Sequence, residues 1–222
     1  MSTFDSARLI ALFEAVATRI ETEKDHLCAL DGHIGDADHG IAMAQGFNAV
    51  HAAVTDLDPG AAAPSDVFNT AAKAFLNAVG ASSGPLYATA FMRAGAALKG
   101  KEVATEDDMA QAFQAMAQGI EDRGKAAVGD KTMVDAWRPA ADALSKAREG
   151  GSDLAAALHA AEQAAAKGAE ATADMVAAKG RSSRLGERAR GHVDPGAASA
   201  AIIIEVMAKS LSATGGAGGE GA

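Results

Sequence analysis

The sequence predicts an all-α fold, a single domain of about eight helices in which neighbours run antiparallel. Apolar residues recur with the spacing of a helix face along most of the chain, and no segment alternates polar and apolar residues for long enough to form a sheet. The composition agrees, because 49% of the 222 residues are hydrophobic but only 4% are aromatic, so alanine and leucine fill the core. Most of the predicted loops are short, which favours antiparallel packing of consecutive helices.

Each predicted helix begins at a capping residue and ends at a glycine or in a polar loop. In chain order the predicted helices cover about residues 5–30, 40–56, 65–79, 86–100, 105–122, 132–148, 153–179 and 196–211. The candidate caps are, in the same order, Ser2 or Asp5, Asp38, Ser65 or Asp66, the serines of GASSGP, Thr105, Thr132, Ser152 or Asp153, and Asp194.

Four of these helices have features of their own. The first carries an apolar stripe over Leu9–Ile20 at helical spacing. The fifth begins with a capping box, in which Thr105 is followed three residues later by Asp108 in place of Glu. Pro139 is expected to kink the sixth helix, because the proline ring clashes with a preceding carbonyl. The seventh helix is rich in alanine and is expected to end near Lys179.

Composition and charge limit the domain organisation and the function classes. We assign residues 1–211 to one domain and residues 212–222, SATGGAGGEGA, to a flexible glycine-rich tail. The net charge of -9 and the pI near 5.1 argue against a nucleic-acid-binding or a membrane-binding surface. The chain has no predicted signal peptide, no run of about 18 apolar residues and one cysteine, Cys28, so we expect a cytoplasmic protein.

Four of the predicted loops are unusual, and they alternate with ordinary turns. The loops that enter the second, fourth, sixth and eighth helices read DGHIGDADHG, GASSGP, GKAAVGDKT and GRSSRLGERARGHVDPG. Because alternate loops of an up-and-down bundle lie at the same end, we expect these four to meet on one rim. Each leads into a helix start, where unpaired N–H groups and the positive end of the helix dipole favour anions and phosphates.

The acidic turn LDGHIGDADHG holds Asp31, Asp36 and Asp38. On a helix Asp31 and Asp36 would point about 140° apart, so we expect a tight, glycine-rich turn in which the three carboxylates converge. Carboxylates this close repel one another unless a cation lies between them or they share protons. The hard oxygen ligands indicate Mg²⁺, Mn²⁺ or Ca²⁺ rather than structural zinc. The alternative is a solvated acidic turn in which Asp38 caps the second helix.

The other three loops allow both a structural and a binding interpretation. Ser82 and Ser83 are either ordinary caps or phosphate ligands, and Met133 either packs in the core or covers an aromatic base. Asp194 followed by Pro195 is a standard entry to a helix. The arginines of the last loop either neutralise transferring charge, dock a partner or remain solvated. They are Arg181, Arg184, Arg188 and Arg190.

The four loops together resemble those of a known family. ALDGHIGDADHGIAMAQGF, GASSGPLY, GKAAVGDKTMVDAW and GRSSRLGERARGHVDPGAAS are similar to motifs of the nucleotide-binding L subunits of bacterial dihydroxyacetone kinases, and the resemblance covers residues 3–211. It implies a barrel of eight antiparallel helices that binds ADP or ATP at one end through two Mg²⁺ ions. It also implies phosphoryl transfer to the alcohol group of a ketose, which a separate K subunit holds.

By position, the resemblance assigns two kinds of site residue. The Mg²⁺ ligands are Asp31, Asp36 and Asp38. The nucleotide-binding residues are His39, Gly40, Ile41 and Ala42 at the phosphates, Ser82 and Ser83 also at the phosphates, Gly124 and Met133 beside the base and sugar, and Arg181, Asp194, Pro195 and Gly196 closing over the nucleotide. No general base is assigned in this chain.

The resemblance also implies partners. The K-type subunit is the first, and a phosphocarrier protein recharges the bound ADP in some members, whereas others use free ATP. A homodimer is compatible with the sequence. Alternatives left open are a kinase subunit for another small ketose such as a tetrulose, an ADP-loaded binding module sensed by a transcriptional regulator, and a protein-docking end without a nucleotide. Many members carry an aromatic residue in place of Arg184, so the last loop is unusually basic here.

Overall fold

The computed structural model describes residues 2–212, which fold into eight α-helices, two 3₁₀ segments and one isolated β-bridge between Phe4 and Ala104. The elements are α1 (Ser6–Ile34), α2 (His39–Thr55), α3 (Pro64–Ala78), α4 (Ser83–Ala97), α5 (Glu106–Gly124), α6 (Val134–Glu149), α7 (Leu154–Ala171), η1 (Thr172–Asp174), η2 (Arg181–Ala189) and α8 (Pro195–Ser212). Within this range, no helix combines the length and the apolar character that crossing a membrane requires.

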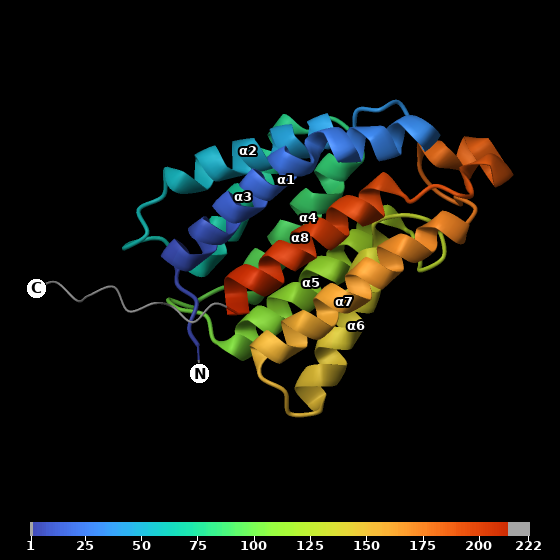
Figure 1. Ribbon diagram of the computed structural model, residues 1–222. Helices are drawn as coiled ribbons and strands as arrows, with labels where there is room; N and C mark the ends of the chain where they lie inside the picture. The colour runs from blue at the N-terminus through green and yellow to red at the C-terminus, as the bar shows by residue number, and fades with distance from the viewer. Residues whose placement is uncertain (1, 213–222) are drawn as a thin grey trace, which may run out of the picture.

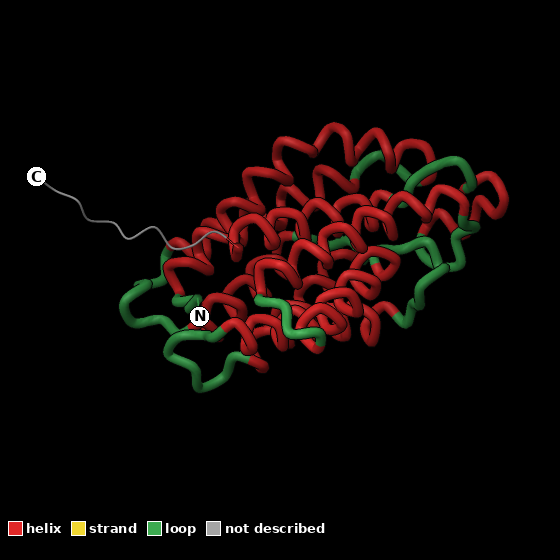
Figure 2. Tube along the Cα trace, turned by 60° about the horizontal axis from the view of Figure 1, so that its bottom comes forward, coloured by secondary structure: helices red, strands yellow, loops and turns green. Residues whose placement is uncertain are grey.

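The eight helices close into a ring (Figure 1). Each helix packs against the next one in the sequence, and α8 packs against α1. The connecting loops therefore gather at the two ends of the ring, as the second view shows (Figure 2). The predicted all-α fold of about eight antiparallel helices is confirmed.

Aromatic side chains fill the middle of the ring. Phe47, Phe75, Tyr87 and Phe91 are buried, with ring centroids between 5.1 and 6.2 Å apart. Most of these ring pairs meet at steep angles, which is the preferred geometry of aromatic contacts. Alanines occupy many of the remaining core positions, so the helices can approach one another closely.

Helices α6 and α7 come close together at Gly168. A Cβ atom at this position would lie 1.9 Å from the carbonyl oxygen of Asp135, so no larger residue fits. Pro139 leaves this carbonyl free, because proline has no N–H group to bond the carbonyl four residues earlier. α6 continues from Val134 to Glu149 through the proline, and the predicted kink stays a prediction.

The first helix is longer than predicted. α1 ends at Ile34 rather than near residue 30, so Asp31 lies in its last turn and not in an open turn. The physical reason is burial, since Ile34 packs against Ala177 and Ala189 of the chain segment that precedes α8. Local sequence patterns cannot predict the end of α1, because it depends on a contact between residues far apart in the chain.

The seventh helix is shorter than predicted. α7 ends at Ala171 rather than near Lys179, and η1 follows it directly. The carbonyl of Thr172 accepts a hydrogen bond from the ammonium group of Lys131, which draws the chain out of the helical path. The stretch that the sequence predicts as an irregular loop contains the 3₁₀ residues Arg181–Ala189.

Three smaller boundaries also differ from the predictions. α4 begins at Ser83 rather than at residue 86. α3 begins at Pro64, and Asp66 is not its N-cap but accepts the backbone N–H of Ala63 from within the first turn, at 3.0 Å. Ser212, assigned to the tail, is the last residue of α8, whereas the remainder of the predicted tail lies outside the described residues.

The predicted capping box opens α5. Thr105 Oγ1 accepts the N–H of Asp108 at 3.2 Å, and Asp108 Oδ2 accepts the N–H of Thr105 at 2.9 Å. The backbone hydrogen bond from Thr105 is the largest cause that holds the pKa of Asp108 below its ordinary value, and Lys101 adds an ion pair at 3.0 Å.

Replacing Thr105 with alanine is expected to lower the free energy of unfolding by about 1 kcal/mol, because the N–H of Asp108 loses its acceptor. Urea denaturation measures this loss. Thr105→Ser keeps the hydroxyl and is the matched control. An equal loss in both variants would contradict the capping role.

Candidate functional site

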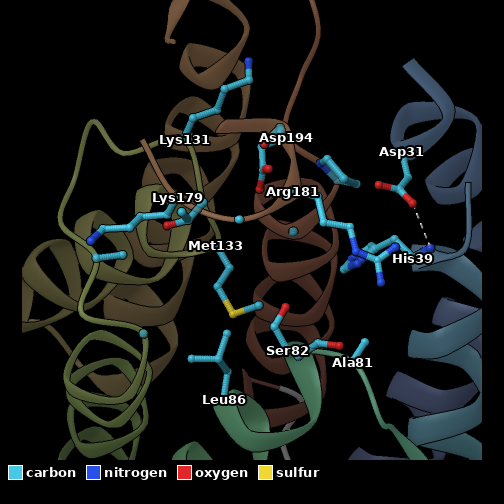
Figure 3. A pocket seen from close by; sticks show the side chains of 18 of the residues that line it. Asp31, His39, Ala81, Ser82, Leu86, Lys131, Met133, Lys179, Arg181 and Asp194 are labelled. Atoms are coloured by element: carbon cyan, nitrogen blue, oxygen red, sulfur yellow. Dashed lines mark hydrogen bonds between the residues drawn. The ribbon is translucent and has the colours of Figure 1, made fainter. Parts of the chain in front are cut away.

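Four loops enclose a cavity at the end of the ring where α2, α4, α6 and α8 begin (Figure 3). The cavity has a volume of about 660 Å³. Each of the four unusual loops contributes to its lining, for example through Asp36, Ser82, Thr132 and Arg181. The prediction that these loops meet on one rim is therefore confirmed.

Most of the predicted site residues line this cavity. They are Asp31, Asp36, Asp38, His39, Ala42, Ser82, Ser83, Gly124, Met133, Arg181, Asp194, Pro195 and Gly196. Gly40 and Ile41 do not line it. A Cβ on Gly40 would lie 2.0 Å from the carbonyl oxygen of Lys24, so this residue faces α1, and the Ile41 side chain is 49% exposed. These two residues can contribute only backbone N–H groups to a ligand at the start of α2.

One part of the cavity is apolar. Met133 and Leu86 approach each other there, and Ile120 and Val134 also line the cavity. Asp31 and His39 lie on the opposite side, whereas the polar Ser82 lies beside Met133 (Figure 3). A ligand with an apolar ring at one end and negative charge at the other fits this division.

The helix starts at the two ends of the ring are capped differently. At the far end, the side chains of Asp5, Thr105 and Asp153 cap α1, α5 and α7. At the cavity end, the N-cap residues of α2, α4 and α6 make no capping hydrogen bond through their own side chains. Asp31 accepts the N–H of His39 at the start of α2, and Thr132 Oγ1 accepts the N–H of Val134 at the start of α6. The remaining N–H groups of these first turns and the positive ends of the helix dipoles favour an anionic ligand.

Asp31, Asp36 and Asp38 converge as predicted. Each offers a carboxylate oxygen within 4.8 Å of the others. Asp31 is buried, and its Oδ2 accepts the backbone N–H groups of Asp38 at 2.9 Å and of His39 at 3.2 Å. These bonds fold the chain back over the last turn of α1, which explains how carboxylates on and after a helix can meet.

The cluster of three carboxylates fits a hard divalent cation. Asp36 and Asp38 remain about half exposed, so a cation can reach their oxygens from the cavity. In the structure the guanidinium of Arg181 contacts Asp36 and lies 3.7 Å from Asp38. A positive group therefore already compensates the repulsion between the carboxylates. Oxygen ligands without a thiolate are the set that Mg²⁺ prefers in proteins.

Lys131 is a cavity residue that the sequence reasoning missed. It is 1% exposed, and its ammonium group donates to the carbonyls of Thr172 and His192. Burial lowers the pKa of Lys131, while the nearby Asp194 and Asp135 carboxylates raise it. Lys131 thus fastens the loop before α6 to both ends of the segment before α8. The motif GDKT contains the lysine but does not reveal these contacts.

Asp194 caps α8, as its position before Pro195 predicts. Its Oδ2 accepts the N–H of Ala197 at 2.8 Å, and its own N–H donates to Thr172 Oγ1 at 2.9 Å. Burial raises the pKa of Asp194 to about 7, although the hydrogen bond from Ala197 and the charge of Lys131 lower it in part. This carboxylate is engaged within the protein, unlike those of Asp36 and Asp38.

His39 turns its side chain toward α8 at the base of the cavity. Its Nε2 lies 2.9 Å from Ser199 Oγ. Burial lowers the pKa of His39 to about 4, opposed in part by Asp31, so the imidazole is neutral at pH 7. Ser199 is fully buried and was also missed, because a serine between alanines in an apolar helix resembles a small core residue.

Comparisons with known proteins agree on one family. A family model described as the DAK2 domain matches residues 33–209. The chain is 40% identical over 190 residues to the ADP-binding subunit of the PEP-dependent dihydroxyacetone kinase of Escherichia coli (strain K12). This alignment covers 84% of this chain and 88% of that subunit. It is 37% identical over 205 residues to the corresponding subunit of PEP-dependent dihydroxyacetone kinase 1 of Listeria innocua, with coverages of 92% and 96%.

A solved structure is also similar. The dihydroxyacetone kinase from C. freundii in complex with AMP-PNP and Mg²⁺ matches 95% of this chain with a TM-score of 0.70 and 26% sequence identity. This chain spans 35% of that longer protein.

Proposed function

This chain belongs to the DAK2 domain family, and we propose that it is the ADP- and ATP-binding subunit of a dihydroxyacetone kinase, a phosphotransferase with an alcohol group as acceptor. The observation that carries the proposal is one cavity that joins three converging carboxylates to the starts of α2, α4 and α6. In a magnesium-bound di- or triphosphate, the cation compensates the negative charge of the carboxylates, and the phosphates compensate the partial positive charge of the helix starts. The names of the relatives as ADP-binding subunits support the same ligand.

The apolar part of the cavity and the carboxylate cluster support one orientation of the nucleotide. We place the base between Met133 and Leu86, and the phosphates toward Asp31 and the start of α2. Ser82 is the N-cap of α4, but its side chain makes no capping bond, so its hydroxyl can donate to a phosphate oxygen. Gly196 lies in the first turn of α8, where a Cβ would meet Asp194 Oδ2 at 2.9 Å, so a larger residue would press on the carboxylate that caps this helix.

We propose that two Mg²⁺ ions bind to Asp31, Asp36 and Asp38 together with the phosphates. Three carboxylates offer six oxygen atoms, and Mg²⁺ sites usually combine one or two carboxylates with substrate phosphates. When bound, the metal neutralises charge on the transferring phosphoryl group. The chain itself adds the dipoles of α2, α4 and α6 and the positive charge of Arg181 at the cavity.

The reaction needs a partner. We propose that a separate K-type subunit holds the ketose and presents its hydroxyl to the nucleotide, since no general base is assigned in this chain. The names of the relatives, PEP-dependent in Escherichia coli and Listeria innocua and PTS-dependent in Lactococcus lactis, support a phosphoryl donor other than free ATP, and we assign this role to a phosphocarrier protein. A single cysteine fits a reducing compartment such as the cytoplasm.

Addition of ADP with Mg²⁺ is expected to stabilise the protein. A ligand at 100 times its dissociation constant adds about 2.7 kcal/mol to the free energy of unfolding, which raises the melting temperature of a protein of this size by roughly 5–10 °C. Differential scanning fluorimetry with ADP, with Mg²⁺ and with both checks this result. AMP with Mg²⁺ is the control ligand, because it lacks the β-phosphate. Equal melting temperatures with and without ADP and Mg²⁺ would refute the proposed function.

A further inference from the structure

A serine outside the cavity is joined to the start of α2 by a hydrogen bond. We propose that Ser199 is a positioning residue that acts through His39 to hold this helix start in place for phosphate binding. The inference rests on the proposed function, because it concerns the same nucleotide site. Ser199 does not line the cavity, so its effect must pass through another residue.

The hydrogen bonds of Ser199 fix the form of the His39 ring. Ser199 Oγ donates its one hydrogen to the carbonyl of Gly196 at 3.0 Å. Toward His39 Nε2, at 2.9 Å, the same oxygen must then be the acceptor. His39 Nε2 therefore carries the proton, and Nδ1 has none in the neutral ring. One hydroxyl sets both the tautomer and the direction of the imidazole.

The start of α2 is held from two sides. On one side, Gly40 packs so closely on α1 that a Cβ would meet the carbonyl oxygen of Lys24 at 2.0 Å. On the other side, the bond between His39 and Ser199 ties the same turn to α8. Without this second contact, the first turn of α2 can move away from α8 and from the cavity between them.

The affected turn provides the N–H groups that remain for a phosphate. The N–H groups of Asp38 and His39 already donate to Asp31, and the N–H of Ala42 donates to the carbonyl of Asp38. Within residues 2–212, the N–H groups of Gly40 and Ile41 donate to no backbone carbonyl outside the helix. Their N–H groups point along the helix axis toward its start. A displaced helix start would therefore weaken phosphate binding directly.

Tyr87 offers a matched control. It is fully buried, which raises the pKa of its hydroxyl, while the neighbouring side chains of Trp137 and Ser199 lower this pKa in part. Tyr87→Phe, like Ser199→Ala, removes one buried oxygen from the interior of the ring. Only Ser199→Ala removes the contact with His39.

The binding experiment measures the affinity for ADP in excess Mg²⁺ by isothermal titration calorimetry. Ser199→Ala is expected to raise the dissociation constant about fivefold to tenfold, as the loss of one buried hydrogen bond predicts. Tyr87→Phe is expected to leave it unchanged. Ser199→Thr keeps the acceptor oxygen and is expected to restore at least half of the lost binding energy. Equal affinities of the Ser199→Ala variant and the wild type would overturn the inference.

Two further measurements separate positioning from a general packing effect. In a His39→Ala background, Ser199→Ala is expected to cause a smaller loss than in the wild type, because the route through His39 is removed and only the contact with the Gly196 carbonyl remains. An additive loss would overturn the inference. Nitrogen-15 NMR of the nucleotide-free protein should show the Nε2-protonated tautomer of His39 in the wild type and a mixture of tautomers in Ser199→Ala. An unchanged tautomer in the variant would contradict the proposed link, whether or not the wild type binds ADP. Failure of the wild type to bind ADP would refute the proposed function instead.

Discussion

Replacing Asp36 with alanine is expected to abolish magnesium-dependent nucleotide binding. Asp36 is one of three carboxylates whose oxygens lie within 4.8 Å of one another, and it is half exposed toward the cavity. Its loss leaves Asp31 and Asp38, and Asp31 already accepts two backbone N–H groups. The remaining donors are then too few to hold the metal and the phosphates together. We expect the dissociation constant for ADP in excess Mg²⁺ to rise at least about 100-fold, as coordination chemistry suggests.

Isothermal titration calorimetry measures this change, and Asp142→Ala is the control. Asp142 is an exposed carboxylate on α6 that does not line the cavity, so its removal changes the net charge equally. The free energy of unfolding of nucleotide-free Asp36→Ala should stay within about 0.5 kcal/mol of the wild type, because the residue is exposed. Full retention of ADP affinity in Asp36→Ala would defeat the assignment of the metal site.

Replacing Lys131 with methionine is expected to lower the free energy of unfolding by about 2–4 kcal/mol. The methionine fills similar space but donates no hydrogen bond to the buried carbonyl of Thr172 or to that of His192. It also removes the positive charge near Asp194, whose buried carboxylate then lacks its compensating cation. The His192 carbonyl loses the ammonium donor, the Thr172 carbonyl keeps only the N–H of Met175, and the Asp194 carboxylate is uncompensated, so all three effects act in the same direction.

Urea denaturation of the nucleotide-free protein measures this loss. Lys99→Met, at an exposed position after α4 and at the far end of the ring, should change the free energy of unfolding by less than about 0.5 kcal/mol. A loss below about 1 kcal/mol in Lys131→Met would show that the hydrogen bonds of Lys131 to Thr172 and His192 do not hold these loops together. Because Lys131 joins two cavity loops, we also expect weaker ADP binding in this variant.

The sequence predicts the helices well where local signals determine them. The capping box of Thr105 and Asp108 correctly places the start of α5, and the alternation of ordinary and unusual loops correctly predicts that the latter meet at one end. The failures lie where distant residues decide the outcome. Burial of Ile34 against a segment more than a hundred residues away extends α1, and Lys131 shortens α7 through the carbonyl of Thr172. Such contacts leave no mark in local periodicity.

The candidate site shows the same limit. Charge density in the acidic turn reveals Asp31, Asp36 and Asp38, because three carboxylates so close in sequence need compensation. Ser199 gives no comparable signal, since small residues in an apolar helix usually only fill space. Its contact with His39 spans 160 positions along the chain. The convergence of the candidate ligand-binding residues was therefore predictable, and the residue that contacts one of them from α8 was not.

The closure of the ring has a consequence for biosynthesis. Around the ring each helix packs against the next one in the sequence, and the ring closes at the seam between α1 and α8, where Arg19 and Glu205 form an ion pair at 3.3 Å. Bringing such distant segments together costs more loop entropy than any other contact in the ring, so this seam is expected to form last. Asp31 comes from α1 and Asp194 directly precedes α8. We therefore expect a nascent polypeptide to bind nucleotide only after its eighth helix has left the ribosome.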